Sequence, residues 1–238
     1  MKKTVDIVIP TYRPGEKYKQ LLKRLKTQSY PAGHIYVVNT GEGYYHEDEY
    51  PVLDNLSVTH ITTAEFDHGG TRDMAARKGD GDLILFMTDD AVPADDFLIE
   101  NLVKYFEDGR VGAAYARQLP APDCGLIERY TRSFNYPEES SLKSKGDLKK
   151  LGIKTFFCSN VCAMYRRDIY QELGGFPTHT IFNEDMIFAS AVIQAGLSIA
   201  YAADARVIHS HNYSGIQQFH RNFDMAVSQA EHPEVFAG

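Results

Sequence analysis

Two adjacent carboxylates follow the most apolar stretch of the chain. Residues 83–87 (LILFM) are typical of a buried strand, and Thr88-Asp89-Asp90 comes directly after them. In open parallel sheets ligands bind just beyond the carboxyl ends of the strands, so these acids stand where a ligand would bind. Carboxylate oxygens suit Mg²⁺ or Mn²⁺, with phosphate oxygens and waters completing the coordination shell. On spacing alone, an exposed turn with a helix-capping acid explains the pair equally well.

A second candidate is Asn183-Glu184-Asp185, at the start of an expected helix. Helix capping is the ordinary explanation for acids and Asn at such a position. The aromatic residues Phe176 and Phe182 favour a further role, because apolar neighbours would bury the turn and raise the pKa of a carboxylate there. A buried acid opposite a metal site is a candidate general base.

Two histidines, His209 and His211, follow an expected strand. If the strand continues this far, residues at i and i+2 share one face, so both imidazoles could aim at the same point and one could ligate a metal. Zinc, with Cys158 and Cys162 as further ligands, is an alternative. It is the weaker one, because Cys-x₃-Cys is not the usual tight spacing and buried cysteine is common as a small apolar residue.

The string FDHGGTRD, residues 66–73, is the fourth candidate. Its paired glycines allow close approach of the backbone, a helix N-terminus follows, and Arg72 can make charge-assisted bonds to phosphate. The string matches neither the Walker loop nor the three-glycine dinucleotide fingerprint. Standing alone, it would be interpreted as a plain turn.

Length and composition exclude several classes of protein. A chain of 238 residues, 43% hydrophobic and with 13 Phe and 15 Tyr, can bury enough apolar surface to fold, which excludes a disordered protein. No uninterrupted apolar stretch reaches the roughly 18–20 residues of a membrane helix. The chain opens without a signal-peptide pattern and has an odd number of cysteines, 3, so we expect a cytoplasmic protein.

The net charge of -7 is unevenly distributed. Residues 1–30 hold 8 Lys/Arg against 2 Asp/Glu, a local +6, whereas residues 40–110 hold 17 Asp/Glu against 5 Lys/Arg, a local -12. A protein that binds nucleic acid would show a dominant basic face, so we do not expect such a partner. An acidic centre beside a basic edge better suits a metal ion and a phosphorylated small molecule.

The elements that must position these residues alternate between strands and helices. Expected strands cover residues 4–10, 35–38, 58–62, 83–87 and 111–116, with helices over 16–28, 71–78 and 97–106. Further on we expect a strand over 156–165, helices over 168–173 and 184–195, a strand over 199–208 and a helix over 216–229. This order predicts a mostly parallel α/β sheet.

Residues 118–152 break the alternation. We interpret them as an irregular or helical insertion over the sheet, and not as a separate domain, because the segment shows no apolar face of its own. Tyr130, Phe134 and Tyr136 could stack on sugar rings or lipid of an acceptor, although core packing explains aromatic residues at least as often.

Taken in order, six strings resemble the inverting, metal-dependent nucleotide-sugar glycosyltransferases of family 2, and within them the bacterial rhamnosyltransferase group. The strings are VDIVIPTYRPG, FDHGGTRDMA, LILFMTDDAVP, CSNVCAMYRRDIY, GGFPTHTIFNEDMIFASAVIQAG and ARVIHSHNYSGIQQFHRNFDMA. They cover the chain from about residue 4 to about residue 230. The resemblance implies the GT-A fold, an α/β domain whose mostly parallel central sheet is flanked by helices.

The resemblance also implies roles for single residues. Asp185 would be the catalytic base, Asp90 the main metal ligand and His209 a further metal contact. His211 is given no bond. Contacts to the nucleotide, its phosphates or the donor sugar would come from Thr11, Tyr12, Arg13, Asn39, Asp67, Arg72 and Asp89.

The chain departs from the family pattern at two positions. Asn39 stands where members often have Asp, so recognition of the base could differ in detail. Thr88 replaces the first acid of the Asp-x-Asp motif, but the rhamnosyltransferase-like group commonly has a non-acid there. Relatives often continue past the final helix, so the native chain could extend beyond residue 238.

We therefore expect one glycosyltransferase domain over residues 1–238, with a nucleotide-sugar-binding part over about 1–117 and an acceptor-side part over about 118–238. It would transfer L-rhamnose from dTDP-L-rhamnose to a glycan or lipid-linked acceptor of a bacterial surface polysaccharide, with Mg²⁺ or Mn²⁺ as cofactor. A UDP-sugar is the other donor considered, and peripheral association with the inner face of the cell membrane is expected. The alternatives are a nucleotidyltransferase that makes a nucleotide sugar and a non-catalytic nucleotide-sugar-binding domain.

Overall fold

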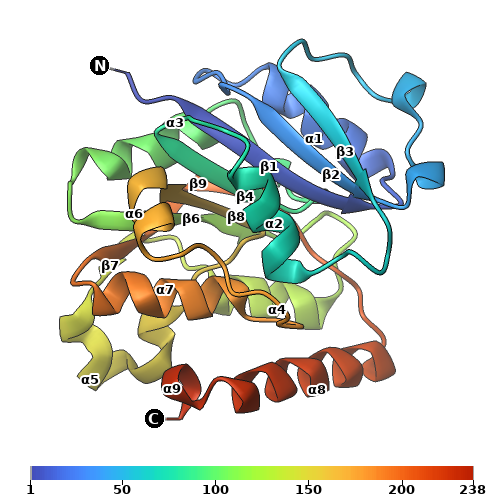
Figure 1. The fold of residues 1–238 in the computed structure, drawn as a ribbon. Helices are drawn as coiled ribbons and strands as arrows, with labels where there is room; N and C mark the ends of the chain where they lie inside the picture. The colour runs from blue at the N-terminus through green and yellow to red at the C-terminus, as the bar shows by residue number, and fades with distance from the viewer. Residues whose placement is uncertain (1, 238) are drawn as a thin grey trace.

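A nine-stranded sheet is the centre of the computed structural model, which describes residues 2–237 (Figure 1). The strand order is β3-β2-β1-β4-β8-β6-β9-β5, and β7 pairs with β9. The strands are β1 (Val5–Tyr12), β2 (Ile35–Thr40), β3 (Leu56–Ile61), β4 (Leu83–Met87), β5 (Val92–Pro93), β6 (Val111–Leu119), β7 (Ser141–Lys143), β8 (Cys162–Arg166) and β9 (Ser198–Ile208).

Helices cover both faces of the sheet. They are α1 (Glu16–Lys26), α2 (His68–Ala76), α3 (Leu98–Val103), α4 (Leu126–Asn135), α5 (Leu148–Leu151), α6 (Arg167–Glu172), α7 (Glu184–Gln194), α8 (Gly215–Glu231) and α9 (Pro233–Phe236). Apolar residues of α1 and α3 fill the core on one face, and those of α2, α6 and α7 fill the core on the other. In the view of Figure 1, α8 lies below α7, farther from the sheet.

The two halves of the sheet differ in strand direction. Strands β3, β2, β1 and β4 are all parallel, which brings their carboxyl ends to one edge. In the second half β8 runs antiparallel to both β4 and β6, while β6 and β9 are parallel. Because β8 is antiparallel to β4, the residues that precede β8 lie at the carboxyl end of β4. The expected helix-flanked sheet is therefore present, and its antiparallel strand β8 supplies a further loop at the ligand-binding edge.

The strands β6 and β9 change register near their ends. Ala116 pairs with Ala202, but the next residue of β6, Arg117, pairs with Arg206. Three residues of β9, 203–205, therefore have no partner on β6 and form a bulge. After the bulge, Leu119 pairs with Ile208, and the backbone N–H of His209 donates to the Leu119 carbonyl at 3.0 Å. The bulge thus sets which residues of the two strands stand side by side at their carboxyl ends.

Several sequence-based expectations require correction. The strand expected over 156–165 begins only at Cys162, because residue 156 ends a 3₁₀ helix (Gly152–Phe156) and a turn closed by the Cys162 N–H and the Ser159 carbonyl, at 3.1 Å, precedes the strand. The short strands β5 and β7 were not foreseen. The expectation that segment 118–152 lacks an apolar face is wrong, since α4 presents an exposed apolar stripe. Its members are Leu126, Ile127, Tyr130 and Phe134, whose exposed fractions are 86%, 87%, 70% and 64%.

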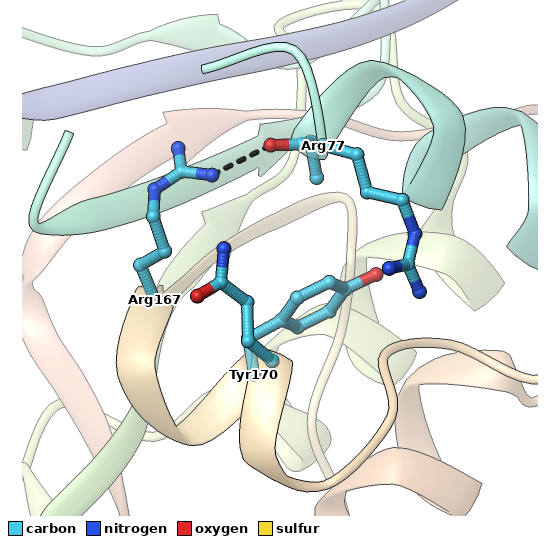
Figure 2. Close-up of a pocket in the computed structure, with 5 residues that line it drawn as sticks. Arg77, Arg167 and Tyr170 are labelled. Atoms are coloured by element: carbon cyan, nitrogen blue, oxygen red, sulfur yellow. Dashed lines mark hydrogen bonds between the residues drawn. The ribbon is translucent and has the colours of Figure 1, made fainter. Parts of the chain in front are cut away.

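A buried ion pair joins α6 to β1 at the edge of the sheet opposite the ligand-binding edge. Arg167, which begins α6, donates to Asp6 of β1 at 2.8 Å, and both side chains are less than a tenth exposed. Arg167 also donates to the Ala76 carbonyl at 2.6 Å, the bond drawn in Figure 2. These contacts wall a small pocket of about 10 Å³, also lined by Arg77 and Tyr170. Its volume is too small for a substrate, so we assign it a structural role.

No helix within residues 2–237 combines the length and the apolar character needed to cross a membrane. The three cysteines Cys124, Cys158 and Cys162 are all free and buried. Cys162 lies in the apolar core, and Cys158 is 3.3 Å from the Tyr165 hydroxyl. The metal-ligating cluster found among the described residues contains neither cysteine, so a zinc site of the kind considered above has no support here.

Candidate active site

The carboxyl ends of β1 and β4 are joined by a hydrogen bond between two predicted site residues. The Thr11 hydroxyl donates to the Asp89 carboxylate at 2.6 Å. Burial raises the pKa of Asp89, the adjacent charge of Asp90 adds to the rise, and the bond from Thr11 opposes it. The two acids after β4 therefore stand in different environments, with Asp89 directed to the β1 side and Asp90 to the histidines after β9.

The expected nucleotide residues of the first β-α unit lie close to an open pocket. Tyr12, half exposed, lines a cavity of about 290 Å³ together with Thr40, Thr63 and Phe66. Such an apolar cleft beside the strand ends is the usual form of a small-molecule site. The position therefore suits a nucleobase, with aromatic side chains on its walls.

Arg13 stands in the left-handed region of backbone conformation, with φ of 52°. Its guanidinium lies 5.1 Å from the Tyr12 ring centroid and 4.4 Å from that of Tyr44. It also donates to the Tyr44 hydroxyl at 2.9 Å. The two aromatic rings hold this cation just beyond the carboxyl end of β1, where a diphosphate could meet it.

Asn39, at the end of β2, is fully buried. Its amide nitrogen donates to the Gly41 carbonyl at 3.0 Å and lies 3.1 Å from His60 Nδ1. Its amide oxygen has no hydrogen-bond partner among residues 2–237. A buried acceptor without a partner is costly, so a donor group of a ligand would relieve it.

The histidines after β9 converge on Asp90. The Nε2 atoms of His209 and His211 are 3.1 Å apart, and they lie 3.4 Å and 3.3 Å from the two carboxylate oxygens of Asp90. Ligand atoms that share one octahedral cation are separated by about 3 Å, so these three side chains fit a divalent metal ion. His211, which is assigned no metal contact from the sequence alone, belongs to this cluster.

The protonation of the cluster also suits a cation. Burial and the neighbouring His209 lower the pKa of His211 to about 4, so its imidazole is neutral near pH 7. Burial alone would raise the pKa of Asp90, but its contacts with His209 and His211 outweigh burial and hold that pKa below its usual range. A neutral imidazole and an ionised carboxylate are the forms in which these groups bind metal.

Asp185, at the start of α7, has the environment expected of a general base. Its carboxylate accepts hydrogen bonds from the backbone N–H groups of Asn160 at 3.1 Å and Met186 at 2.8 Å. Burial and the adjacent charge of Glu184 raise the pKa of Asp185 to about 7, although these two bonds oppose the rise. A carboxylate with a pKa near neutrality can both take up and release a proton at the working pH.

Arg72 is placed differently from the expectation of an open phosphate contact. It is buried, forms an ion pair with Glu184 at 3.5 Å and donates to the His68 carbonyl at 2.8 Å. Glu184 accepts in turn from the Asn160 side chain at 3.1 Å. Arg72 and Asn160 therefore both support the turn that carries Asp185, because both contact the neighbouring Glu184.

Asp67 caps α2. Its carboxylate accepts from the backbone N–H groups of Gly70 and, at 2.6 Å, His179. The neighbouring glycine is required by packing, because a Cβ atom on Gly69 would meet the Pro177 carbonyl oxygen at 1.9 Å. The close backbone approach expected from the paired glycines is thus made to the loop before α7.

The turn before β8 brings the separate parts of the site together. The Ser159 hydroxyl contacts Gln118, the Asn160 backbone contacts Asp185, and the Val161 carbonyl accepts from the Thr88 backbone N–H at 3.1 Å. Three successive residues thereby link β6, α7 and the acidic turn after β4. Asn160 and Gln118 were not identified from the sequence, because a lone amide carries no motif.

The aromatic residues proposed as acceptor contacts divide into two groups. Tyr136 is buried in the core and receives a hydrogen bond from Gln118 at 2.6 Å, so it has a packing role. Tyr130 and Phe134 are exposed on α4, with ring centroids 6.2 Å apart. These two rings remain available to a ligand.

The fold defines a class of α/β proteins that includes solved glycosyltransferase structures. The chain aligns over its full length with the mannosyltransferase PcManGT from Pyrobaculum calidifontis, whose structure was solved in complex with GDP-Man and Mn²⁺. That alignment covers 73% of the mannosyltransferase chain, at 17% identity and a TM-score of 0.65. The expected GT-A fold is confirmed by this likeness.

The family follows from the sequence comparisons. Residues 6–174 match the family Glycosyl transferase family 2, so the chain belongs to this family. The chain is 43% identical over 235 residues to the O-antigen chain rhamnosyltransferase RfbN of Salmonella typhimurium, which covers 97% of this chain and 74% of the relative. It is 38% identical to the O-antigen chain rhamnosyltransferase WbaN of Salmonella anatum, over 96% of this chain and 73% of that one. The expected family is confirmed, which favours a glycosyltransferase over a nucleotidyltransferase.

Proposed function

We propose that the protein transfers L-rhamnose from dTDP-L-rhamnose to a glycan or lipid-linked acceptor in the synthesis of a bacterial surface polysaccharide. The two O-antigen rhamnosyltransferases to which it is 43% and 38% identical support the reaction. The observation that carries the proposal is the turn over residues 159–161, which connects the candidate base Asp185 to the acidic turn of Asp89 and Asp90. A base and a diphosphate-binding site must face each other for sugar transfer.

The donor would occupy the edge formed by the parallel strands, in the nucleotide-sugar-binding part over about 1–117. Tyr12 and Asn39 would meet the base, and Arg13 the diphosphate; the pocket beside Tyr12 and the unpaired amide oxygen of Asn39 support these roles. Thr11 and Asp89 would face the ribose and the donor sugar. Asp67 and Arg72 act in this proposal by holding the loops around the donor, since both are occupied by internal contacts.

Asp90, His209 and His211 would hold the metal ion. Mg²⁺ prefers oxygen ligands, whereas Mn²⁺ also accepts imidazole nitrogen, so the two histidines favour Mn²⁺ of the two cations considered. Bound there, a divalent cation supplies charge stabilisation for the departing diphosphate.

Asp185 would act as the general base on the acceptor side of the site. Its carboxylate takes the proton of an acceptor hydroxyl while that oxygen attacks the anomeric carbon. The new bond forms on the face opposite the diphosphate, the bond from the anomeric carbon to the diphosphate oxygen breaks, and the configuration inverts. A positioned base of this kind contributes about 10²–10⁴-fold to the rate. The pKa of about 7 suits the task, because a large share of the base is then ionised at neutral pH and most of it at higher pH.

The acceptor side, over about 118–238, would meet the inner face of the cell membrane. Exposed Lys154 lies beside the apolar stripe of α4, with its ammonium 5.7 Å from the Phe134 ring centroid. Exposed aromatic and aliphatic side chains beside lysines suit the interface of an anionic bilayer. A lipid-linked acceptor would be presented at such a surface.

The experiment that tests the function uses purified protein with dTDP-L-rhamnose, UDP-sugars and GDP-mannose, each with Mn²⁺. We expect release of nucleoside diphosphate from dTDP-L-rhamnose, accelerated by a lipid-linked acceptor and lost in Asp185→Asn. Turnover of another donor in preference to dTDP-L-rhamnose would overturn the sugar assignment. Full activity of Asp185→Asn would overturn the mechanism.

A further inference from the structure

A buried amide, Gln118 of β6, contacts the metal-site histidine from the side away from Asp90. It is 2% exposed, and its Oε1 lies 3.0 Å from His209 Nδ1. The same oxygen accepts a hydrogen bond from the guanidinium of Arg132 on α4. The amide nitrogen donates to the Tyr136 hydroxyl at 2.6 Å and to Ser159 at 3.1 Å. All the hydrogen-bonding groups of this side chain are therefore occupied.

Arg132 determines which way the amide points. A guanidinium only donates hydrogen bonds, so the atom of Gln118 that faces it must be the oxygen. The hydroxyls of Tyr136 and Ser159 can donate or accept and would tolerate either orientation. Arg132 is itself held by Glu128 on the same helix, with the two side chains 2.5 Å apart and 14% and 17% exposed. The orientation of the amide thus depends on a partly buried ion pair of α4.

The orientation of Gln118 then determines the form of His209. The amide oxygen can only accept, so the Nδ1 atom of His209 must carry a proton to make the 3.0 Å bond. In the neutral ring Nε2 is then the atom with the free lone pair, and it faces His211 and Asp90. The tautomer of a metal-binding histidine is generally set by the bond at its other nitrogen.

We propose that Gln118, oriented by Arg132, is a positioning residue that fixes neutral His209 in its Nδ1–H tautomer and so directs the Nε2 lone pair to a divalent cation. This inference rests on the proposed metal site but not on the identity of the donor or acceptor. It also connects α4, the helix with the exposed apolar stripe, to the metal site through one side chain. Helix α4 and the cation site are then parts of one hydrogen-bonded unit.

The direct test is nuclear magnetic resonance of the metal-free wild-type protein, with ¹⁵N-labelled imidazoles. His209 is assigned by the signal that disappears in His209→Gln, and the spectrum is recorded well above the ordinary pKa of histidine. We expect the ¹⁵N shifts of a ring protonated at Nδ1. A ring protonated at Nε2 would overturn the proposal, and this measurement requires no variant at Gln118.

The second test is titration of the metal-free protein with Mn²⁺ alone, followed by calorimetry or electron paramagnetic resonance. Gln118→Met removes the acceptor at similar size, and we expect about 10–100-fold weaker Mn²⁺ binding. Gln118→Glu keeps an acceptor for both His209 and Arg132 and should retain most of the affinity. Arg129→Met is the control, because Arg129 lies on the same helix and its guanidinium donates to the Cys124 carbonyl at 3.3 Å, away from Gln118 and His209.

Equal Mn²⁺ affinity in wild type and folded Gln118→Met would contradict the proposal, as would equal losses in Gln118→Met and Arg129→Met. Thermal unfolding shows whether each variant is folded. Neither test uses a sugar donor. A protein that shows the Nδ1–H form and the expected affinities, yet does not transfer rhamnose, would overturn the proposed function and leave the role of Gln118 standing.

Discussion

The backbone N–H of Asn160 donates to the carboxylate of Asp185 at 3.1 Å. A backbone donor cannot rotate away, so this bond fixes the position of the candidate base relative to β8. The Asn160 side chain meanwhile donates to Glu184 and accepts from the Tyr165 hydroxyl at 2.9 Å. One residue thus orients both acids of the turn, and it does so from the segment that also contacts the acidic motif after β4.

We expect Asp185→Asn to lower the rate of transfer by about 10²–10⁴-fold, because the amide cannot accept the acceptor's proton. Binding of the donor should change little, since the acidic and histidine residues of the donor side are untouched. Steady-state kinetics with dTDP-L-rhamnose would measure the first effect, and calorimetric donor binding the second. A variant that loses donor binding and turnover together would indicate a structural role for Asp185.

The pKa of Asp185 predicts two opposite dependences on pH. Transfer should rise as pH increases through about 7, because the base acts in its ionised form. Stability should change in the other direction. The folded-state pKa is raised from 3.8 to about 7, so between these values the folded chain holds a proton that the unfolded chain has lost, and the free energy of unfolding falls as pH rises. Asp185→Asn should lack this fall, which denaturant unfolding at several pH values would detect.

Removal of the metal should abolish transfer, and addition of Mn²⁺ should restore it. His211→Ala should weaken Mn²⁺ binding about as strongly as His209→Ala, because both Nε2 atoms face the Asp90 carboxylate. His220→Ala is the control, since His220 is an exposed residue of α8. Unchanged Mn²⁺ affinity in His211→Ala would restrict the site to Asp90 and His209.

Arg72→Met should destabilise the fold by about 3–5 kcal/mol, because it leaves the buried Glu184 carboxylate without its charged partner. The matched control is Arg77→Met on the same helix. Arg77 is 61% exposed, and its partner Asp73, 14% exposed, keeps a hydrogen bond from the Tyr170 hydroxyl at 3.2 Å, so the loss of Arg77 should cost less, about 0–1 kcal/mol. Chemical denaturation measures both values, and a similar small cost for both variants would refute the structural role of the Arg72–Glu184 pair.

Gly69→Ala should also destabilise the protein, by at least about 1–3 kcal/mol, since the added methyl group meets a backbone carbonyl that cannot move aside easily. Gly109→Ala provides the comparison, because a Cβ atom there has no neighbour within 4 Å. The melting temperatures of the two variants give the answer. If both melt like the wild type, the loop at Pro177 is less firmly packed than its contacts indicate.

The membrane proposal can be checked with vesicles. Ile127→Ser combined with Phe134→Ser should reduce sedimentation of the protein with vesicles that contain anionic phospholipid, and high salt should reduce it further. Val52→Ser, an equally apolar and 80% exposed position outside the stripe, is the control. Unchanged vesicle binding in the double variant would exclude α4 as the contact. Loss of self-association in sedimentation velocity would instead identify the stripe as a dimer surface.

Local patterns were sufficient to predict much of the molecule. The apolar run before Asp89 and Asp90, the glycines in the first turn of α2 and the aromatic residues before Asp185 are local signals, and each lies in or next to the element or turn expected for it. The rule that ligands bind at the carboxyl ends of parallel strands brought the acidic turn and the ends of β1 and β2 together without any tertiary information.

The remaining features depend on contacts between distant parts of the chain. Gln118 and His209 are 91 residues apart, and Asn160 and Asp185 are 25 residues apart, so no local pattern reveals either pair. Arg72 shows the same difficulty in another form. Its charge and its neighbouring glycines suggest an anion contact, but its partner is the buried Glu184, which only the packing of α2 against α7 could reveal.

The bulge at residues 203–205 has a consequence for how this site can be altered by deletion, insertion or recombination with relatives. The bulge adds three residues to β9 after Ala202. As a result, His209 lies beside Leu119 and Gln118, and no earlier or later residue of the chain takes that place. A change of length there would shift the histidines along the strand as a unit, away from Asp90. A chimaera that exchanges β9 must therefore conserve the length of this segment as strictly as the histidines themselves.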